Sequence, residues 1–122
     1  MHLIGMILVW LVALMIIYVG IMYLAKNEKN AAGFGLPVLP DASARAWWQL
    51  KGSRDIVSGI APIVLIFAQP DALPWLILVE SLIAIADMLV ILANGGSRGR
   101  AFGIHGVTAG VMIIAVVLLW VG

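Results

Sequence analysis

The sequence has no cysteine, and only 11% of its 122 residues are charged. Without cysteine the chain cannot form disulfide bonds, thiolate metal sites, iron–sulfur clusters or a cysteine nucleophile. Its net charge of +1, with the basic residues scattered, leaves no basic patch for nucleic acid. No glycine-rich phosphate loop follows a strand-like segment, so nucleotide binding is not expected either.

Hydrophobic residues make up 64% of the sequence, and the mean hydropathy is +1.15. Soluble domains average about 45–50% apolar and about 25% charged residues. A soluble fold of this length cannot hide so much apolar surface, because small domains leave much of their surface exposed. The composition therefore predicts an integral membrane protein, and the length predicts a single transmembrane domain over residues 1–122.

Four apolar runs use most of the chain, at residues 3–25, 46–68, 75–93 and 101–121. A helix needs about 20 residues to cross a hydrocarbon core of ~30 Å. The runs lack the alternation of barrel strands, and open sheets are not viable in lipid. They predict an all-α integral membrane four-helix bundle with a long connection at residues 26–45. No Lys or Arg precedes the first run, which favours an uncleaved span over a signal peptide.

The connections predict an orientation. The first and third connections hold five basic residues (Lys26, Lys29, Arg45, Arg98 and Arg100), whereas the middle one holds one acid and no base. The positive-inside rule then places both basic connections in the cytoplasm and both termini outside, in what we expect to be a bacterial inner (plasma) membrane. Trp47 and Trp48 would mark the inner interface, and Trp75 and Trp120 the outer one.

The first connection is rich in glycine and proline, in Gly33-Phe-Gly-Leu-Pro37 and Pro40-Asp41. This density favours an ordered turn or a re-entrant lip over a helix. Such a segment would cover the cytoplasmic mouth of the bundle. The alternative is a flexible linker, since nothing in the segment forces order.

Ionisable side chains interrupt the last three spans at Lys51, Arg54, Asp55, Glu80, Asp87 and His105. Each charge at a helix centre costs about 2.5–3.5 kcal/mol, so these groups should face one another or a wet cavity. At a rise of 1.5 Å per residue, Arg54 and Asp55 lie roughly 12 Å inside the cytoplasmic end, Asp87 about 9 Å and His105 about 6 Å. Similar depth on three helices predicts one shared cavity that opens toward the cytoplasm.

Helical spacing suggests roles for these residues. Lys51 and Asp55 form an i,i+4 pair, and we expect Arg54 to contact Asp87 across two helices. The predicted catalytic residues are Arg54, Asp55, Asp87 and His105. The predicted ligand-binding residues are Lys51, Ser58, Glu80 and Thr108. In the fourth span, Gly103, Gly106 and Gly110 predict close helix packing.

Each of these residues also has a purely structural reading. Lys51 with Asp55 is then a local ion pair near the interface, Arg54 with Asp87 locks two helices together, and His105 is a satisfied polar residue. No metal site is expected, because one buried histidine and separated acids do not match zinc spacing.

The pattern Lys51-Gly-Ser-Arg54-Asp55…Gly59, followed by Asp87, Gly95-Gly96 and His105-Gly106, resembles a bacterial and fungal family of small four-span membrane proteins. The Gly33–Pro37 segment is similar too. The family is catalogued as a domain of unknown function, so the resemblance implies an architecture over nearly the whole chain and no activity.

The residue set favours an enzyme without metal or redox cofactor that performs acid–base chemistry on a lipophilic substrate, as an isomerase, cyclase or epoxide hydrolase does. In this hypothesis an arginine keeps one Asp ionised, the second Asp is the general acid and His105 relays the proton. A small proton-coupled transporter is the alternative, since Glu80 and Asp87 share a helix face; a ligand-binding or accessory subunit is another. The expected partners are membrane lipids, a lipophilic substrate and further copies of the chain, because four helices barely enclose a cavity.

Overall fold

The computed structural model describes residues 1–39 and 41–122, so the predicted turn at Pro40 lies outside the described residues. The described chain is all-α. Its long helices are α1 (His2–Ala25), α3 (Arg45–Ala68) and α4 (Leu73–Ala93). A last helical run joins α5 (Arg98–Arg100), a π-helical segment η3 (Ala101–Gly106) and α6 (Val107–Val121). The helix bounds agree with the predicted spans to within a few residues.

Three helical stretches are long and apolar enough to cross a membrane: His2–Ala25, Pro70–Ala93 and Arg98–Val121. The second of these includes the short 3-10 turn η2 (Pro70–Ala72) that leads into α4. These stretches indicate a membrane protein. Helix α3 is equally long but less apolar, because it carries Arg45, Lys51, Arg54 and Asp55.

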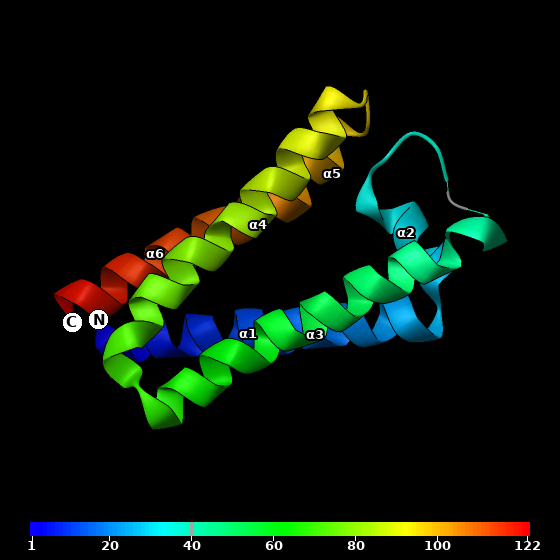
Figure 1. Cartoon of the computed structure of the whole chain (residues 1–122). Helices are drawn as coiled ribbons and strands as arrows, with labels where there is room; N and C mark the ends of the chain where they lie inside the picture. Colours follow the sequence, from blue (N-terminus) through cyan, green and yellow to red (C-terminus); the bar gives the residue numbers. More distant parts are fainter. Residues whose placement is uncertain (40) are drawn as a thin grey trace.

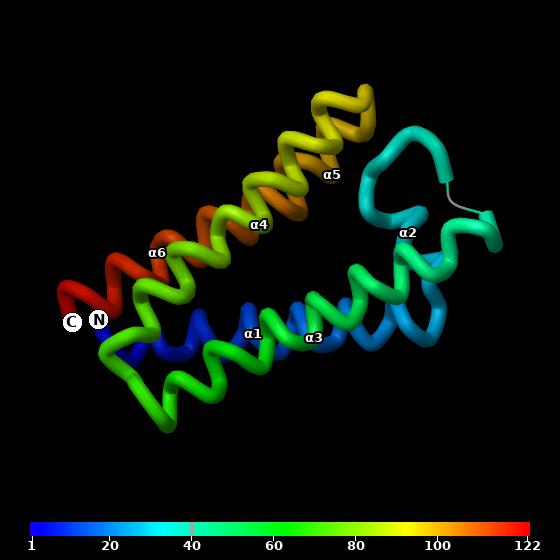
Figure 2. Tube along the Cα trace, in the orientation of Figure 1, coloured from blue at the N-terminus to red at the C-terminus, as the bar shows by residue number. Residues whose placement is uncertain are grey.

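The long helices form two pairs, α1 with α3 and α4 with α6 (Figure 1). The pairs meet near the two termini and diverge toward the other end of the molecule, as the trace in Figure 2 also shows. Where they meet, a buried apolar cluster joins α1, α4 and α6: Val9, Leu73, Ile77, Met112, Ala115, Val116 and Leu119. Trp75 and Trp120 stack edge to face at this end, with ring centroids 5.0 Å apart.

Glycines let α1 and α3 pack closely. Gly20 faces Gly52, and Gly59 lies against Ala13 and Ile17, where a Cβ atom would overlap its neighbours. The glycines of the fourth span do not play this role. A Cβ on Gly103 or Gly110 would meet no described residue within 4 Å, so the predicted close approach there is wrong within the described chain. Only Gly106 has a near neighbour across helices, the sulfur of Met88.

The first connection begins with a short helix, α2 (Asn27–Phe34), where we predicted a turn or lip. The prediction was wrong because the glycines mark the end of this helix and not its absence. Six residues without glycine or proline precede Gly33, and the helix stops at Gly35, whose φ of 117° suits glycine. The Asn30 amide fixes the junction with α1 by donating to the carbonyl oxygens of Met22 and Lys26.

Helix α2 and the turn that follows it, residues 27–36, lie between the diverging helix pairs, and we call this segment the α2 lid (Figure 1). It is bonded to the far pair: the Ser97 amide donates to the Gly35 carbonyl at 2.8 Å, and the Arg100 guanidinium donates to the Ala32 carbonyl at 2.7 Å. A second apolar cluster fills the contact: Tyr23, Ala31, Phe34, Ile91 and Ala101. The lid therefore covers the end of the molecule at which the helix pairs diverge. From the sequence, we expected this segment to cover a mouth of the bundle.

The connection ends in a 3-10 turn, η1 (Ala42–Ala44), just before α3. The Asp41 carboxylate accepts hydrogen bonds from the Ser43 amide and hydroxyl. These bonds stabilise the ionised form and hold the pKa of Asp41 below its usual range.

Candidate functional site

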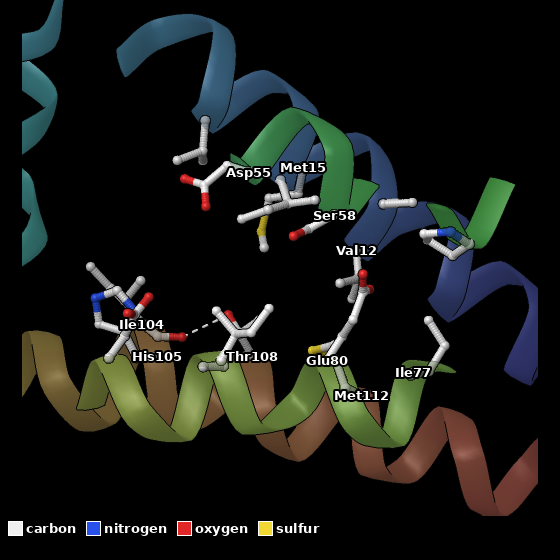
Figure 3. Close-up of a pocket in the computed structure, with 17 residues that line it drawn as sticks. Val12, Met15, Asp55, Ser58, Ile77, Glu80, Ile104, His105, Thr108 and Met112 are labelled. Atoms are coloured by element: carbon white, nitrogen blue, oxygen red, sulfur yellow. Dashed lines mark hydrogen bonds and ion pairs between the residues drawn. The ribbon is translucent and has the colours of Figure 1, made fainter. Parts of the chain in front are cut away.

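A cavity of about 140 Å³ lies between the two helix pairs, below the α2 lid. Its wall is mostly apolar and comes from α1, α3, α4, η3 and α6. Six polar residues also line it: Asp55, Ser58, Glu80, Asp87, His105 and Thr108. In Figure 3, Asp55 and Ser58 face Glu80, His105 and Thr108 across this space. Asp55, Asp87 and His105, which the sequence placed at similar depth, all line this cavity.

Asp55 reaches the cavity from the buried face of α3, which it shares with Gly52, Gly59 and Pro62. It is 6% exposed and accepts a 2.8 Å hydrogen bond from the Lys51 ammonium. The predicted i,i+4 pair is therefore present. The ammonium also lies 4.8 Å from the Tyr23 ring centroid and 5.1 Å from that of Phe34, so two aromatic faces stabilise it. Lys51 itself is not part of the cavity wall and acts on it through Asp55.

Arg54 does not contact Asp87. Among the described residues Arg54 makes no ion pair, and it is exposed and absent from the cavity wall. The prediction was wrong because neighbouring helix positions differ in direction by about 100°. With Asp55 on the buried face of α3, Arg54 lies on an exposed face of the same helix. The cation that pairs with a cavity acid is Lys51.

His105 sits in the π-helical segment η3, a kind of local widening that is frequent at functional sites. Its Nε2 atom lies 3.1 Å from the carbonyl oxygen of Phe34 in the α2 lid. Its ring centroid is 4.6 Å from that of Phe34. On the other side, Nδ1 lies 3.8 Å from a carboxylate oxygen of Asp87. His105 thus links the lid to α4.

These contacts determine which ring nitrogen of His105 must carry a proton. A carbonyl oxygen only accepts hydrogen bonds, so Nε2 must carry a proton. Nδ1 then faces Asp87 either as a second N–H or as a lone pair. The 3.8 Å between Nδ1 and the carboxylate oxygen is an ion-pair distance, longer than a direct hydrogen bond. Asp87 and His105 both line the cavity, so a molecule bound there would lie beside both groups.

The remaining polar residues of the cavity differ in whether their side chains already have a hydrogen-bond or ion-pair partner. Thr108 donates to the Ile104 carbonyl at 2.7 Å, so its hydroxyl is already used within the helix. Glu80 is half-buried on the cavity side of α4, among Ile77, Ile83 and Met112, and forms no ion pair with any described residue. Ser58 lines the wall one turn beyond Asp55. Glu80 and Ser58 therefore retain hydrogen-bonding capacity toward the cavity.

No group of three His, Cys, Asp or Glu side chains in the described part of the chain is arranged to hold a metal ion. Sequence reasoning missed two contributors to the site. Helix α1 has no charged residue, yet Tyr23 packs on Lys51 and Val12, Ala13 and Val19 form cavity wall. Phe34 contributes through its backbone carbonyl, and no side-chain pattern could have revealed that.

Comparison with known proteins gives a family and no activity. No curated protein and no solved structure matches the chain. One family profile, described as "Domain of unknown function (DUF4267)", matches residues 13–120, which include every residue of the cavity wall except Val12. The chain therefore belongs to this family of unknown function.

Proposed function

We propose that the protein is an integral membrane enzyme that binds a lipophilic molecule between its two helix pairs and transfers protons without a metal or redox cofactor. The observation that carries this proposal is the cavity itself. Its wall is apolar, yet carboxyl groups from α3 and α4 and an imidazole from η3 face the same space. Polar groups inside a membrane bundle are costly, which makes their grouping around a cavity a sign of function.

The proposed chemistry assigns a role to each group. Asp55, paired with Lys51, is the carboxylate that accepts a proton from the substrate or from an attacking water. Asp87 donates a proton to the substrate, and His105, whose Nδ1 lies 3.8 Å away, restores it. Glu80 and Ser58 orient polar atoms of the substrate. Such a set serves an isomerase, a cyclase or an epoxide hydrolase.

The size of the cavity limits what reacts there. An engineered protein cavity of about 150 Å³ holds one benzene molecule. A volume of about 140 Å³ therefore fits one ring or a short branched unit, either a whole small molecule or the reacting end of a longer one.

We further propose that α3 is a fourth span and that the two pairs form a four-helix bundle in a bacterial inner (plasma) membrane. At 24 residues, α3 is about 36 Å long. Its Lys51–Asp55 pair lowers the cost of insertion. The basic residues gather at the end that holds the α2 lid, which supports a cytoplasmic lid and outside termini. The open face of Gly103 and Gly110 supports contact with further copies of the chain.

The test of the enzyme uses purified protein in nanodiscs, a lipid extract of its source membrane and heavy water. We expect mass spectrometry to find a lipophilic compound that the wild type converts or labels with deuterium. Asp87→Asn and Asp55→Asn should still retain that compound but convert it at least about 100-fold more slowly. Arg54→Gln is the matched control and should stay active. Equal conversion by the Asp87→Asn variant would refute the proposed role of the site.

A proton-coupled transporter is the second candidate, and one observation favours it. Glu80 and Asp87 both line the cavity from one face of α4, seven residues apart, and such a pair can relay a proton along the helix. In proteoliposomes a transporter would accumulate the compound unchanged when a pH gradient is applied, and Glu80→Gln would abolish this accumulation. Conversion of the compound without a gradient favours the enzyme. A compound that is bound but neither converted nor moved favours a ligand-binding or accessory subunit.

A further inference from the structure

A second hollow, of about 370 Å³, lies beside the cavity and under the α2 lid. Its wall comes from α1 (Tyr18, Val19, Met22 and Tyr23), from the lid (Lys29, Asn30, Gly33 and Phe34) and from Ile104 of η3. We call it the lid groove. Val19 and Ile104 line both the groove and the cavity, so the two hollows adjoin at these two apolar side chains.

The lid groove and the cavity differ in polarity. Of the described residues, those that line the cavity include three carboxyl groups and no Lys or Arg. The described residues of the groove include no carboxyl group, but they do include Lys29 and the exposed Tyr18. Among the described residues Lys29 forms no ion pair, and the exposed Arg98 and Arg100 lie on the segment that binds the lid. The groove is thus suited to negative charge, and the cavity wall is suited to an apolar chain.

We propose that the lid groove binds the head of an anionic amphiphile whose apolar chain passes between Val19 and Ile104 into the cavity. This inference rests on the proposed function, because it names the class of substrate for that site. Lys29 pairs with a carboxylate or phosphate, and the Tyr18 hydroxyl donates to the same group. The carboxyl groups of the cavity disfavour a negative charge there, so the ligand enters chain first.

The ligand's head has two possible sources with the same chemistry: a free single-chain amphiphile, or an anionic lipid of the bilayer. The cavity holds only one short chain segment, so a free single-chain molecule fits it better than a two-chain lipid.

The experiment measures binding in phosphatidylcholine nanodiscs with three twelve-carbon probes: dodecanoate, dodecyl phosphate and dodecanol, each with a diazirine at the chain end. After irradiation, mass spectrometry locates the label and titration gives the affinity. We expect all three to label cavity residues such as Glu80 and Asp87. Lys29→Gln should weaken both anionic probes about fivefold and leave dodecanol unchanged. Lys29→Arg should restore most of the affinity.

Lys26→Gln is the matched control, because it removes the same charge three residues earlier, from a position outside the groove. Equal weakening by Lys26→Gln and Lys29→Gln would overturn the proposal, since diffuse surface charge would then explain it. Unchanged binding of the anionic probes to Lys29→Gln would overturn it too. After either result, the proposed function still stands if dodecanol labels the cavity. If no probe labels the cavity, the groove proposal and the proposed function are both refuted. Competition by added phosphatidylglycerol would identify the bilayer as the source of the head group.

Discussion

Gly20 of α1 and Gly52 of α3 touch backbone to backbone. A Cβ atom on Gly20 would lie 2.6 Å from the Gly52 carbonyl oxygen, and one on Gly52 would lie 2.7 Å from that of Gly20. Backbone cannot yield as a flexible side chain does, so a methyl group at either position must push the helices apart. The distance between α1 and α3 in turn sets where Asp55 lies, because Asp55 follows Gly52 by three residues on the same buried face.

Gly20→Ala and Gly52→Ala should therefore each destabilise the protein by about 1–3 kcal/mol, the usual cost of overpacking. Thermal unfolding in detergent measures the loss. Gly99→Ala is the matched control: the nearest described atom to its Cβ is the Ser97 Oγ at 3.8 Å, an ordinary contact, so it should unfold at the wild-type temperature or slightly above. An equal loss in all three variants would mean that the glycines act through the helix backbone and not through the crossing.

The Lys51–Asp55 pair should dominate the electrostatic stability of α3. Lys51→Met leaves a buried carboxylate without its partner and should cost about 3 kcal/mol. The double variant Lys51→Met/Asp55→Asn should recover part of this loss, because the unpaired charge is gone. Chemical unfolding of the four proteins of the cycle measures the coupling. Arg54→Gln should change stability little, and simple addition of the two single losses would contradict the pairing.

The Phe34 carbonyl should fix the protonation pattern of His105. Because a carbonyl oxygen only accepts hydrogen bonds, Nε2 must carry a proton to bond to it, so the neutral tautomer with its proton on Nδ1 should be absent. Nitrogen-15 NMR of the labelled imidazoles reads this directly, and the His2→Asn variant removes the only other histidine. Detection of the Nδ1-only tautomer for His105 would show that the lid does not bond to the ring.

The α2 lid should open when its turn is strained. Gly35 has a φ of 117°, and a Cβ there would also approach the Cβ of Arg100 at 3.1 Å. We expect Gly35→Ala to speed hydrogen exchange at the amides of residues 27–34 while those of α4 stay protected. Gly95→Ala is the control: Gly95 also has a positive φ, but no residue that the structure describes lies within 4 Å of its Cβ. Unchanged exchange in the lid of the Gly35→Ala variant would mean that other contacts hold it closed.

The two basic connections should lie on one side of the membrane, in the cytoplasm. Because the chain has no cysteine, single cysteines at Ser43 and Ser97 can be labelled without background. Both serines are exposed. In intact cells both cysteines should react only with membrane-permeant thiol reagents. Labelling of both by an impermeant reagent would reverse the orientation, and labelling of one alone would contradict the four spans.

The sequence predicted how deep in the membrane each ionisable residue lies along its helix. It did not predict on which side of the helix that residue lies. The fixed rise per residue placed Asp55, Asp87 and His105 in one layer, and they do line one cavity. Depth did not distinguish Arg54 from its neighbour Asp55, although the two point about 100° apart. That direction depends on Gly52 and Gly59, which select the face of α3 that packs on α1.

Backbone groups were equally hidden from sequence reasoning. The acceptor for His105 is a main-chain oxygen of Phe34, 71 residues earlier in the chain, and main-chain oxygens are the same in every residue type. The prediction of a turn in place of helix α2 was wrong because a glycine indicates only the local backbone conformation. Gly33 and Gly35 report the end of a helix correctly, but they carry no information about the residues before them.

The divergence of the two helix pairs gives the molecule a tapered outline, narrow near the termini and broad around the α2 lid (Figure 1). A tapered body in a bilayer displaces more lipid from one leaflet than from the other. The lipids around it must tilt to follow its sides, and this tilt costs free energy. We therefore expect that cost to be lowest in a membrane that is already curved so that its leaflets follow the taper. We also expect lateral pressure from the acyl chains to act on the angle between the two pairs, so that lipid composition should affect the width of the cavity.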